Sequence, residues 1–203
     1  MNYWAVPRMW EGRTVAIFAG GSSLSVSDVA LIRETQAPVI VVNDAYKLAP
    51  WADLLYAADF DWWRVRWLDV RLFEGLKVTV GDRTIHPDIQ SLRNTGRKGF
   101  DPDPTCIRTG GNSGYQAIHI AIASGAARIL LLGYDMTGTH WFGNHKPPLA
   151  DPPPSSFDIW IPAFEGLNGH GADIINCSPI SKITCFEKGS LEKEIEALGK
   201  WHR

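Results

Sequence analysis

A short apolar run that ends in paired glycines constrains the fold of this chain more than any other feature of its sequence. Residues 14–19 (TVAIFA) are short, apolar and rich in β-formers, which is typical of a buried strand. The run ends in Gly20-Gly21, and residues 22–25 then supply capping side chains for a predicted helix over 26–35. A buried strand that passes through a glycine turn into a helix is the building unit of parallel α/β sheets.

Two further strands are predicted within the first 60 residues. Residues 39–42 (VIVV) form an apolar run that ends in Asn43-Asp44, and residues 54–57 (LLYA) form another that ends in Ala58-Asp59. Strand, helix and strand therefore alternate with short connections. This order predicts an α/β fold of the Rossmann-like type, a three-layer sandwich with a mostly parallel sheet.

The same pattern returns in the second half of the chain. A turn over residues 109–114 (TGGNSG) leads into a predicted helix over 115–124, and residues 128–132 (RILLL) form a strand that ends in Gly133-Tyr134-Asp135. Weaker patterns predict a helix or aromatic turn over 157–167, a last core strand over 172–177 and a terminal helix over 191–198.

Residues 60–73 (FDWWRVRWLDVRLF) combine tryptophans with arginines. Such a stretch can stack bases or contact single-stranded nucleic acid. A helix that packs its tryptophans on the sheet and turns its arginines outward explains the pattern better, and we favour that interpretation.

Length and composition favour a single domain over residues 1–203. A chain of 203 residues fits one hydrophobic core. A hydrophobic fraction of 45% with 21% charged residues excludes global disorder. Stretches rich in Gly and Pro predict long loops near 91–107 and 136–156, and loops of that length are usually functional or mobile.

Net charge and cysteine content argue against two classes of protein, those that bind nucleic acid and those that hold structural zinc. A net charge of −2 does not indicate a nucleic-acid partner. Three cysteines without CxxC spacing fit a reducing compartment and carry no zinc signature. The sequence has no recognisable signal peptide and no apolar run of membrane-spanning length, so we expect a cytoplasmic protein with no membrane span. Its aromatic content is compatible with a homo-oligomer.

Candidate binding residues lie at the carboxyl ends of the predicted strands, where open parallel sheets bind their ligands. A glycine turn lets backbone N–H groups approach an anion, and the following helix adds the positive end of its dipole. Neither GxGxxG nor GxxxxGK[ST] is present, so no nucleotide motif is satisfied outright. The predicted residues for binding a nucleotide are Gly20, Gly21, Ser22, Ser23, Asn43, Asp59, Thr109, Gly110, Gly111, Asn112, Ser113 and Asp135.

Three of these candidates have alternative interpretations. Asp59 and Asp135 can each hold a divalent cation such as magnesium beside phosphates, or can cap a turn or pair with an arginine. Asn43 can bond a base or ribose edge, or can make an Asx turn. We assign no residue to a metal.

His140 and His145 are the candidate catalytic residues. They lie five residues apart in the second predicted loop, in the sequence THWFGNHKPP. Histidines in a loop after a strand end can act as general acid or base, as a pair of metal ligands, or simply as surface groups of a lid.

The motifs carry a resemblance to known families. The segments AIFAGGSSLSVSD and VIVVNDAYKLAPWADLLYAADFDWW resemble small phage and prophage proteins of the type labelled norphogenetic. The layout is more distantly similar to bacterial sialyltransferases of lipooligosaccharide synthesis and to MptE-like hydroxymethylpterin pyrophosphokinases. Both enzyme families have a G-x-G-P-S-L-type turn, here residues 20–24, and a strand that ends in G-x-D, here residues 133–135. This chain is shorter and has Ser22 in place of the proline.

The sialyltransferase resemblance implies roles for individual residues. It implies that Gly21, Ser22, Ser23, Asn43, Thr109 and Gly110 hold a cytidine nucleotide. It implies that a histidine of a lid-like region acts as base, which matches either His140 or His145.

The leading hypothesis is a nucleotide-dependent transferase of glycosyltransferase type that takes a nucleotide or nucleotide-sugar donor of the CMP type as its small-molecule partner. The first alternative is a magnesium-dependent pyrophosphokinase that acts on a small heterocycle. The second is a nucleotide-binding phage accessory protein without turnover, which would act in the cytoplasm of a bacterial host.

Overall fold

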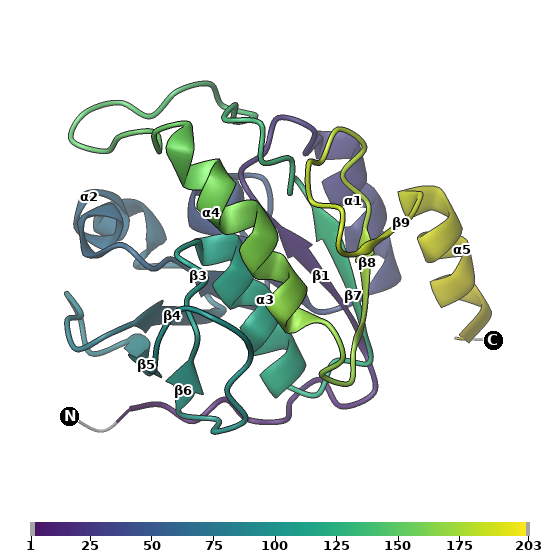
Figure 1. Ribbon diagram of the computed structural model, residues 1–203, viewed down its shortest axis with the longest axis horizontal. Coiled ribbons are helices and arrows are strands. Elements are labelled where there is room, and N and C mark those ends of the chain that lie inside the picture. Colours follow the sequence, from purple (N-terminus) through teal and green to yellow (C-terminus); the bar gives the residue numbers. More distant parts are fainter. Residues whose placement is uncertain (1–2, 202–203) are drawn as a thin grey trace.

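The computed structural model describes residues 3–201, and its centre is a nine-stranded sheet (Figure 1). The strand order is β6-β5-β4-β3-β2-β1-β7-β8-β9, and all neighbouring strands are parallel. The sheet is therefore wholly parallel, where the sequence predicted a mostly parallel one. The strands are β1 (Thr14–Phe18), β2 (Val39–Val42), β3 (Leu54–Tyr56), β4 (Leu76–Val80), β5 (Ile89–Asn94), β6 (Cys106–Ile107), β7 (Arg128–Leu132), β8 (Asp173–Asn176) and β9 (Glu187–Lys188).

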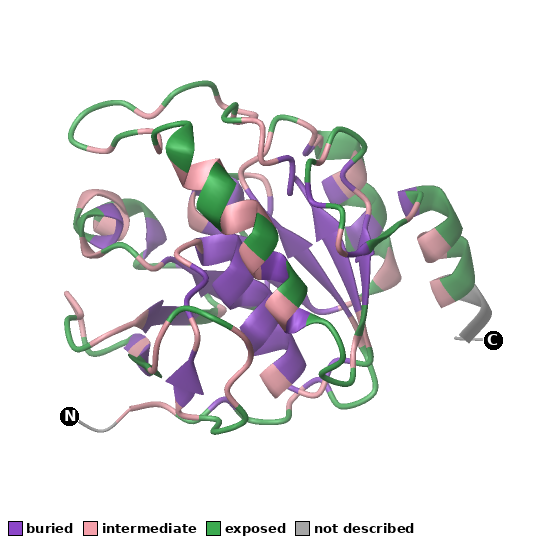
Figure 2. Ribbon diagram, in the orientation of Figure 1, coloured by how far each residue is buried: buried purple, intermediate pink, exposed green. Residues whose placement is uncertain are grey.

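Helices cover both faces of the sheet, which gives the predicted three layers. Alternate side chains of a strand point to opposite faces. Val15 and Ile17 of β1 belong to one core cluster, whereas Ala16 and Phe18 belong to the other. The first cluster packs under α3 (Ser113–Ala123), with α4 (Ser155–Ala163) and the 3-10 helix η2 (Phe164–Leu167) beside it; the second packs under α1 (Val26–Thr35), α2 (Phe60–Val70) and α5 (Leu191–Trp201). The buried residues concentrate in the middle layer and on the helix faces turned toward it (Figure 2).

The sheet changes direction at β1. Strands β1 to β6 are added successively on one side, and the chain then returns through α3 to place β7 on the other side of β1. In open α/β sheets, the crevice outside the carboxyl ends of two strands that separate in this way is the usual ligand site. The carboxyl ends of β1 and β7 are therefore where a site is expected.

Most predicted elements occur within a residue or two of their expected bounds. Residues 60–70 form a helix whose Trp62 and Trp63 are only 3% and 2% exposed, as the packing interpretation predicted. The same interpretation turned the arginines outward, which is wrong for Arg66, because its side chain is 24% exposed and pairs with the buried Asp44. The prediction of a long loop near 91–107 is partly wrong. Strand β5 continues to Asn94, and β6 pairs with it in parallel, so the irregular segment covers only 95–105. The other predicted loop has no helix or named strand between β7 and α4.

Within the described residues, none of the helices combines the length and the apolar character needed to cross a membrane.

Candidate functional site

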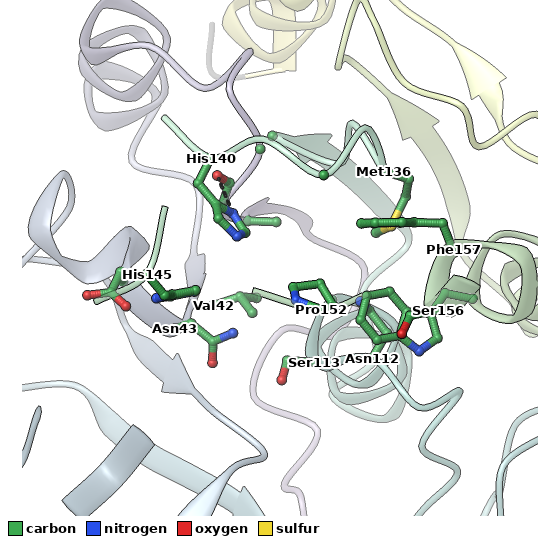
Figure 3. A pocket seen from close by; sticks show the side chains of 18 of the residues that line it. Val42, Asn43, Asn112, Ser113, Met136, His140, His145, Pro152, Ser156 and Phe157 are labelled. Atoms are coloured by element: carbon green, nitrogen blue, oxygen red, sulfur yellow. Dashed lines mark hydrogen bonds between the residues drawn. The ribbon is translucent and has the colours of Figure 1, made fainter. Parts of the chain in front are cut away.

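A cavity of about 420 Å³ lies at the carboxyl ends of the central strands. Its walls come from the turns after β1, β2, β3 and β7, from the start of α3, from the 136–153 segment and from α4. Figure 3 shows Asn43 and His145 toward one end of the cavity and Met136 and Phe157 toward the other, with Asn112 and Ser113 between them. The cavity thus occupies the crevice that the topology predicts.

The turn after β1 is held in shape by Asp135. The backbone N–H of Ser23 donates to Asp135 Oδ2 at 2.8 Å, the Ser22 hydroxyl donates to the same oxygen at 3.2 Å, and the Ser23 hydroxyl donates to Asp135 Oδ1. Asp135 is 1% exposed and does not line the cavity. Its carboxylate is therefore a structural acceptor beneath the turn, which corresponds to the turn-capping alternative for this residue.

Close packing beneath the same turn requires a glycine. The N–H of Gly21 donates to the carbonyl of Gly133 at 2.8 Å, so the turns after β1 and β7 are in direct contact. A Cβ on Gly21 would collide with that carbonyl oxygen and would lie 2.7 Å from Asp135 Cγ. The outer surface of the turn, Gly20-Gly21, faces the cavity.

The second glycine turn places the start of α3 at the cavity. Asn112 is the N-cap of this helix, and its Oδ1 accepts from the N–H of Tyr115 at 3.2 Å. Gly111, Asn112 and Ser113 line the cavity, so the positive end of the helix dipole points into it. Thr109 and Gly110 lie behind the wall: the Thr109 carbonyl accepts from Gln116 Nε2 at 2.8 Å, and Gly110 packs against the ring of Tyr115.

Asn43 directly follows β2 and begins the 3-10 helix η1 (Asn43–Lys47). Its φ is +51°, in the left-handed region that Asn tolerates better than most side chains. Its Oδ1 is buried and has no hydrogen-bond partner in the part of the chain that the structure describes. A buried acceptor without a partner costs free energy, so this oxygen is a strong candidate for contact with a ligand.

The next residue, Asp44, is neutralised by its neighbours. Trp62 Nε1 donates to Asp44 Oδ2 at 3.0 Å, while Lys47 Nζ and Arg66 Nε lie 2.5 and 2.9 Å from Oδ1. Burial alone would raise the pKa of Asp44, but the hydrogen bonds from Lys47 and Trp62 and the two positive charges outweigh it and lower the pKa. Asp44 therefore anchors η1 to α2 as a paired carboxylate.

The 136–153 segment folds back over the first glycine turn. His140 forms an antiparallel bridge with Gly21, and the N–H of Trp141 donates to the Gly20 carbonyl at 3.1 Å. His140 Nδ1 lies 3.3 Å from the same carbonyl oxygen, which accepts a hydrogen bond from it (Figure 3). Both His140 and His145 line the cavity, with their ring centroids 5.0 Å apart.

His145 and Asp59 have shifted acid–base properties. Burial lowers the pKa of His145, and the neighbouring His140 lowers it further. Among the described residues its Nδ1 is buried without a hydrogen-bond partner, so in the tautomer that carries the ring proton on Nε2 the lone pair of Nδ1 can accept a proton. Asp59 lies at the rim of the cavity, where desolvation, followed by the charge of Asp61, raises the pKa of its carboxyl.

The cavity has an aromatic wall that the sequence did not identify as part of a site. Phe157 and Trp160 lie one turn apart on α4, and their rings meet edge to face at a centroid distance of 5.4 Å. Both line the cavity. Their i, i+3 spacing was visible in the sequence, but it does not distinguish a wall of a site from core packing. Aromatic faces of this kind can stack on a base or a sugar ring.

The two glycine turns thus line one cavity, as the hypothesis required. Of the predicted site residues, the structure brings together around it Gly20, Gly21, Asn43, Asp59, Gly111, Asn112, Ser113, His140 and His145. The other predicted residues support the two turns from outside the cavity wall: Ser22, Ser23, Thr109, Gly110 and Asp135.

No protein-family model matches the chain, and no curated protein matches its sequence. Its fold is similar to two solved structures of the sialyltransferase CstII from Campylobacter jejuni. The first, in complex with cytidine-5'-monophosphate, has 14% sequence identity and a TM-score of 0.55 over 88% of this chain and 85% of that chain. The second, in complex with CMP-3FNeuAc, has 15% identity and a TM-score of 0.54 over 87% and 85%.

At this level of identity the likeness shows the fold. The α/β architecture expected from the resemblance to sialyltransferases is confirmed. The resemblances to phage proteins and to MptE-like pyrophosphokinases find no support among these matches.

Proposed function

We propose that the chain is a glycosyltransferase-like transferase whose donor is a sugar linked to cytidine monophosphate. The observation that carries the proposal is the meeting of two glycine turns and the N-terminus of α3 around one cavity at the switch point of the sheet. Backbone N–H groups at the start of α3 and the dipole of that helix provide sites for a phosphate there without a metal motif. The Gly21 N–H is already bonded to the Gly133 carbonyl, so the first glycine turn contributes close approach of its backbone and not this donor. The likeness to CMP-bound structures supports the choice of cytidine.

In this proposal, the donor phosphate lies between the Gly20-Gly21 turn and residues 111–113. Asn43 Oδ1 accepts a hydrogen bond from the base or the ribose, which satisfies its buried lone pair. The wall formed by Phe157 and Trp160 packs against a sugar ring. The 136–153 segment lines one side of the cavity and limits the access of water to the reacting centre.

The transfer itself forms one bond and breaks one. The acceptor hydroxyl oxygen bonds to the anomeric carbon, the bond from that carbon to the phosphate oxygen breaks, and CMP leaves with the bonding electrons. The hydroxyl proton passes to His145 Nδ1, which is buried and free to accept it. The positive end of α3 stabilises the charge on the departing phosphate.

Binding and turnover measurements test this function. Calorimetry with CMP, UMP, GDP and ATP, each with and without magnesium, is expected to show tightest binding of CMP with no need for the metal. Incubation with a CMP-sugar and simple glycoside acceptors is expected to release CMP. The variant His145→Gln should bind CMP as the native chain does and should lose about 10²- to 10⁴-fold in kcat, the usual contribution of a general base.

The alternatives give different results. Binding of ATP that depends on magnesium would favour the pyrophosphokinase, although Asp135, one of the two carboxylates that it would need, is turned away from the cavity. CMP binding without any release from CMP-sugars would favour an accessory protein. Absence of binding by every nucleotide would overturn the proposal.

A further inference from the structure

Three potential metal ligands converge in the segment that covers the cavity. His140, His145 and Asp151 each present one ligand atom, and these atoms all lie within 4.8 Å of one another. His140 Nε2 is 3.4 Å from Asp151 Oδ1. The three residues lie within twelve positions of one loop. The entropic cost of bringing them together is therefore small.

The hydrogen bonds around the cluster orient its ligands. Because His140 Nδ1 faces the Gly20 carbonyl, which can only accept, the proton of a neutral ring sits on Nδ1 and leaves a lone pair on Nε2. Metal-binding histidines are typically fixed in this way, by a backbone carbonyl on the other ring nitrogen. Asp151 Oδ1 is in turn held by the backbone N–H of His145 at 3.1 Å.

The arrangement can accommodate a positive charge. A lone pair on His140 Nε2 and a carboxylate oxygen 3.4 Å away repel each other unless a cation, either a proton or a metal ion, lies between them. Within residues 3–201, the ring nitrogens His140 Nε2 and His145 Nδ1 are both buried without a hydrogen-bond partner. A metal ion would satisfy both nitrogens and the carboxylate together.

The separations suit a small transition-metal ion. Zinc binds His nitrogen and carboxylate oxygen at about 2.0–2.2 Å, which places neighbouring tetrahedral ligands about 3.4 Å apart. The His140–Asp151 pair already has this separation, and a ligand atom of His145 lies within 4.8 Å of both, so His145 has to move closer to complete the set. Two imidazoles favour zinc over magnesium or calcium, which prefer oxygen ligands.

We propose that His140, His145 and Asp151 form a zinc-binding site in the roof of the cavity, with its fourth position open to water or a ligand. The metal would fix the 136–153 segment against the first glycine turn through His140. This zinc site does not depend on the proposed transferase activity. One consequence does rest on that activity, because zinc would occupy the lone pair of His145 that the transfer uses. The zinc-loaded form would therefore be a less active transferase than the metal-free form.

Metal binding is measured on the untagged chain, dialysed against a chelator, in the absence of nucleotide. Titration with Zn²⁺ is expected to give one equivalent bound, and Co²⁺ should give the visible absorption of a low-symmetry four- or five-coordinate site. Asp151→Asn and His145→Gln should each weaken Zn²⁺ binding by at least ~100-fold, the upper end of what loss of an outer-shell partner costs at metal sites. Circular dichroism establishes that each variant is folded.

A matched control is available on the surface. His86 Nδ1 lies 3.4 Å from Asp88 Oδ2, so this pair has similar chemistry, and no third ligand joins it among the residues that the structure describes. His86→Gln should therefore leave Zn²⁺ binding unchanged. The proposal is overturned if the native chain binds no Zn²⁺ in the micromolar range, or if Asp151→Asn binds it as tightly as the native chain does. Either result leaves CMP binding, which is measured without metal, as an independent test of the transferase.

Discussion

Asn43 combines a left-handed backbone with a buried, unpartnered side-chain oxygen. Both features lower the stability of the folded state, and destabilising features of this kind are concentrated at functional sites. The two can be separated by substitution, because glycine keeps the backbone conformation at low cost and removes only the amide group.

Asn43→Gly is therefore expected to leave the free energy of unfolding within ~1 kcal/mol of the native value and to weaken CMP binding by about 10-fold, the equivalent of one hydrogen bond. Asn43→Ala should weaken binding to a similar extent and should also destabilise the fold by a further ~1 kcal/mol, because alanine resists a positive φ. Urea denaturation and calorimetry measure the two effects. CMP binding by Asn43→Gly at native affinity would remove Asn43 from the site.

Asp135 acts on the first glycine turn without contacting the cavity. In Asp135→Asn, one carboxylate oxygen becomes an NH₂ group that faces the hydroxyl and N–H donors of Ser22 and Ser23. A buried mismatch of this kind costs about 1–3 kcal/mol, so the variant should unfold at lower denaturant concentration and bind CMP more weakly.

Ser22→Ala serves as the control for this turn. The Ser22 side chain is exposed and contributes one long hydrogen bond to Asp135, so its loss should change stability by less than ~1 kcal/mol. Equal destabilisation by the two substitutions would contradict the supporting role of the Asp135 carboxylate.

At the scale of elements, α3 connects the fold to the site. Its side chains fill the core on one face of the sheet, and its first turn lines the cavity. Its N-cap, Asn112, therefore affects both the stability of the helix and the binding of a ligand. A substitution at this residue can change one of the two without the other.

Asn112→Asp preserves an N-cap acceptor and adds a negative charge at the positive end of the helix. We expect its free energy of unfolding to be equal to or slightly above the native value, while CMP binding weakens by 10-fold or more because the carboxylate repels the phosphate. Thermal unfolding without ligand and calorimetry with CMP check the two parts. An unchanged affinity for CMP would place the phosphate elsewhere.

The elements that could be predicted from the sequence are those buried on both faces. Strands β1, β2 and β7 lie at the centre of a parallel sheet and read as uninterrupted apolar runs. Strand β5 lies near an edge and is only partly apolar, so the sequence does not predict it and its residues 91–94 fall in the predicted loop. The two-residue strands β6 and β9 are too short to leave a periodic pattern.

The candidate site was predictable to the extent that it follows strand ends. Gly20, Gly21 and Asn43 come directly after central strands, and topology places them at one edge. Asp135 has the same position in the pattern, but its carboxylate turns inward to Ser23, and no sequence signal distinguishes these two directions. Asp151 was missed because its contact with His140 depends on how the loop folds back across the first turn.

For the whole molecule, the buried His119 on α3 ties stability to pH. The pKa of His119 is lowered from 6.5 to about 4, and desolvation is the main cause. Repulsion from His170 and Arg108 lowers this pKa slightly further, whereas the hydrogen bond and the charge of Asp101 raise it. Between pH 6.5 and 4 the unfolded chain therefore binds more protons than the folded chain at this position, and the stability present above pH 6.5 is lost as the pH falls.

Protonation of His119 alone should lower the free energy of unfolding by roughly 3 kcal/mol as the pH falls from 6.5 to 4. His119→Gln removes the titrating group, so its stability should fall less steeply between pH 7 and pH 4.5 than that of the native chain. Urea denaturation at several pH values measures the difference. Parallel curves for the two proteins would show that His119 is not the group responsible.

The central claim is that the paired glycine turns at the switch point form the phosphate site of a cytidine nucleotide. A crystal structure of the chain with CMP tests it most directly. The account predicts phosphate density between Gly20-Gly21 and the first turn of α3, within hydrogen-bonding distance of backbone N–H groups, and the cytidine beside Asn43. Well-defined CMP density outside this cavity, or with its phosphate directed away from both turns, would contradict the account.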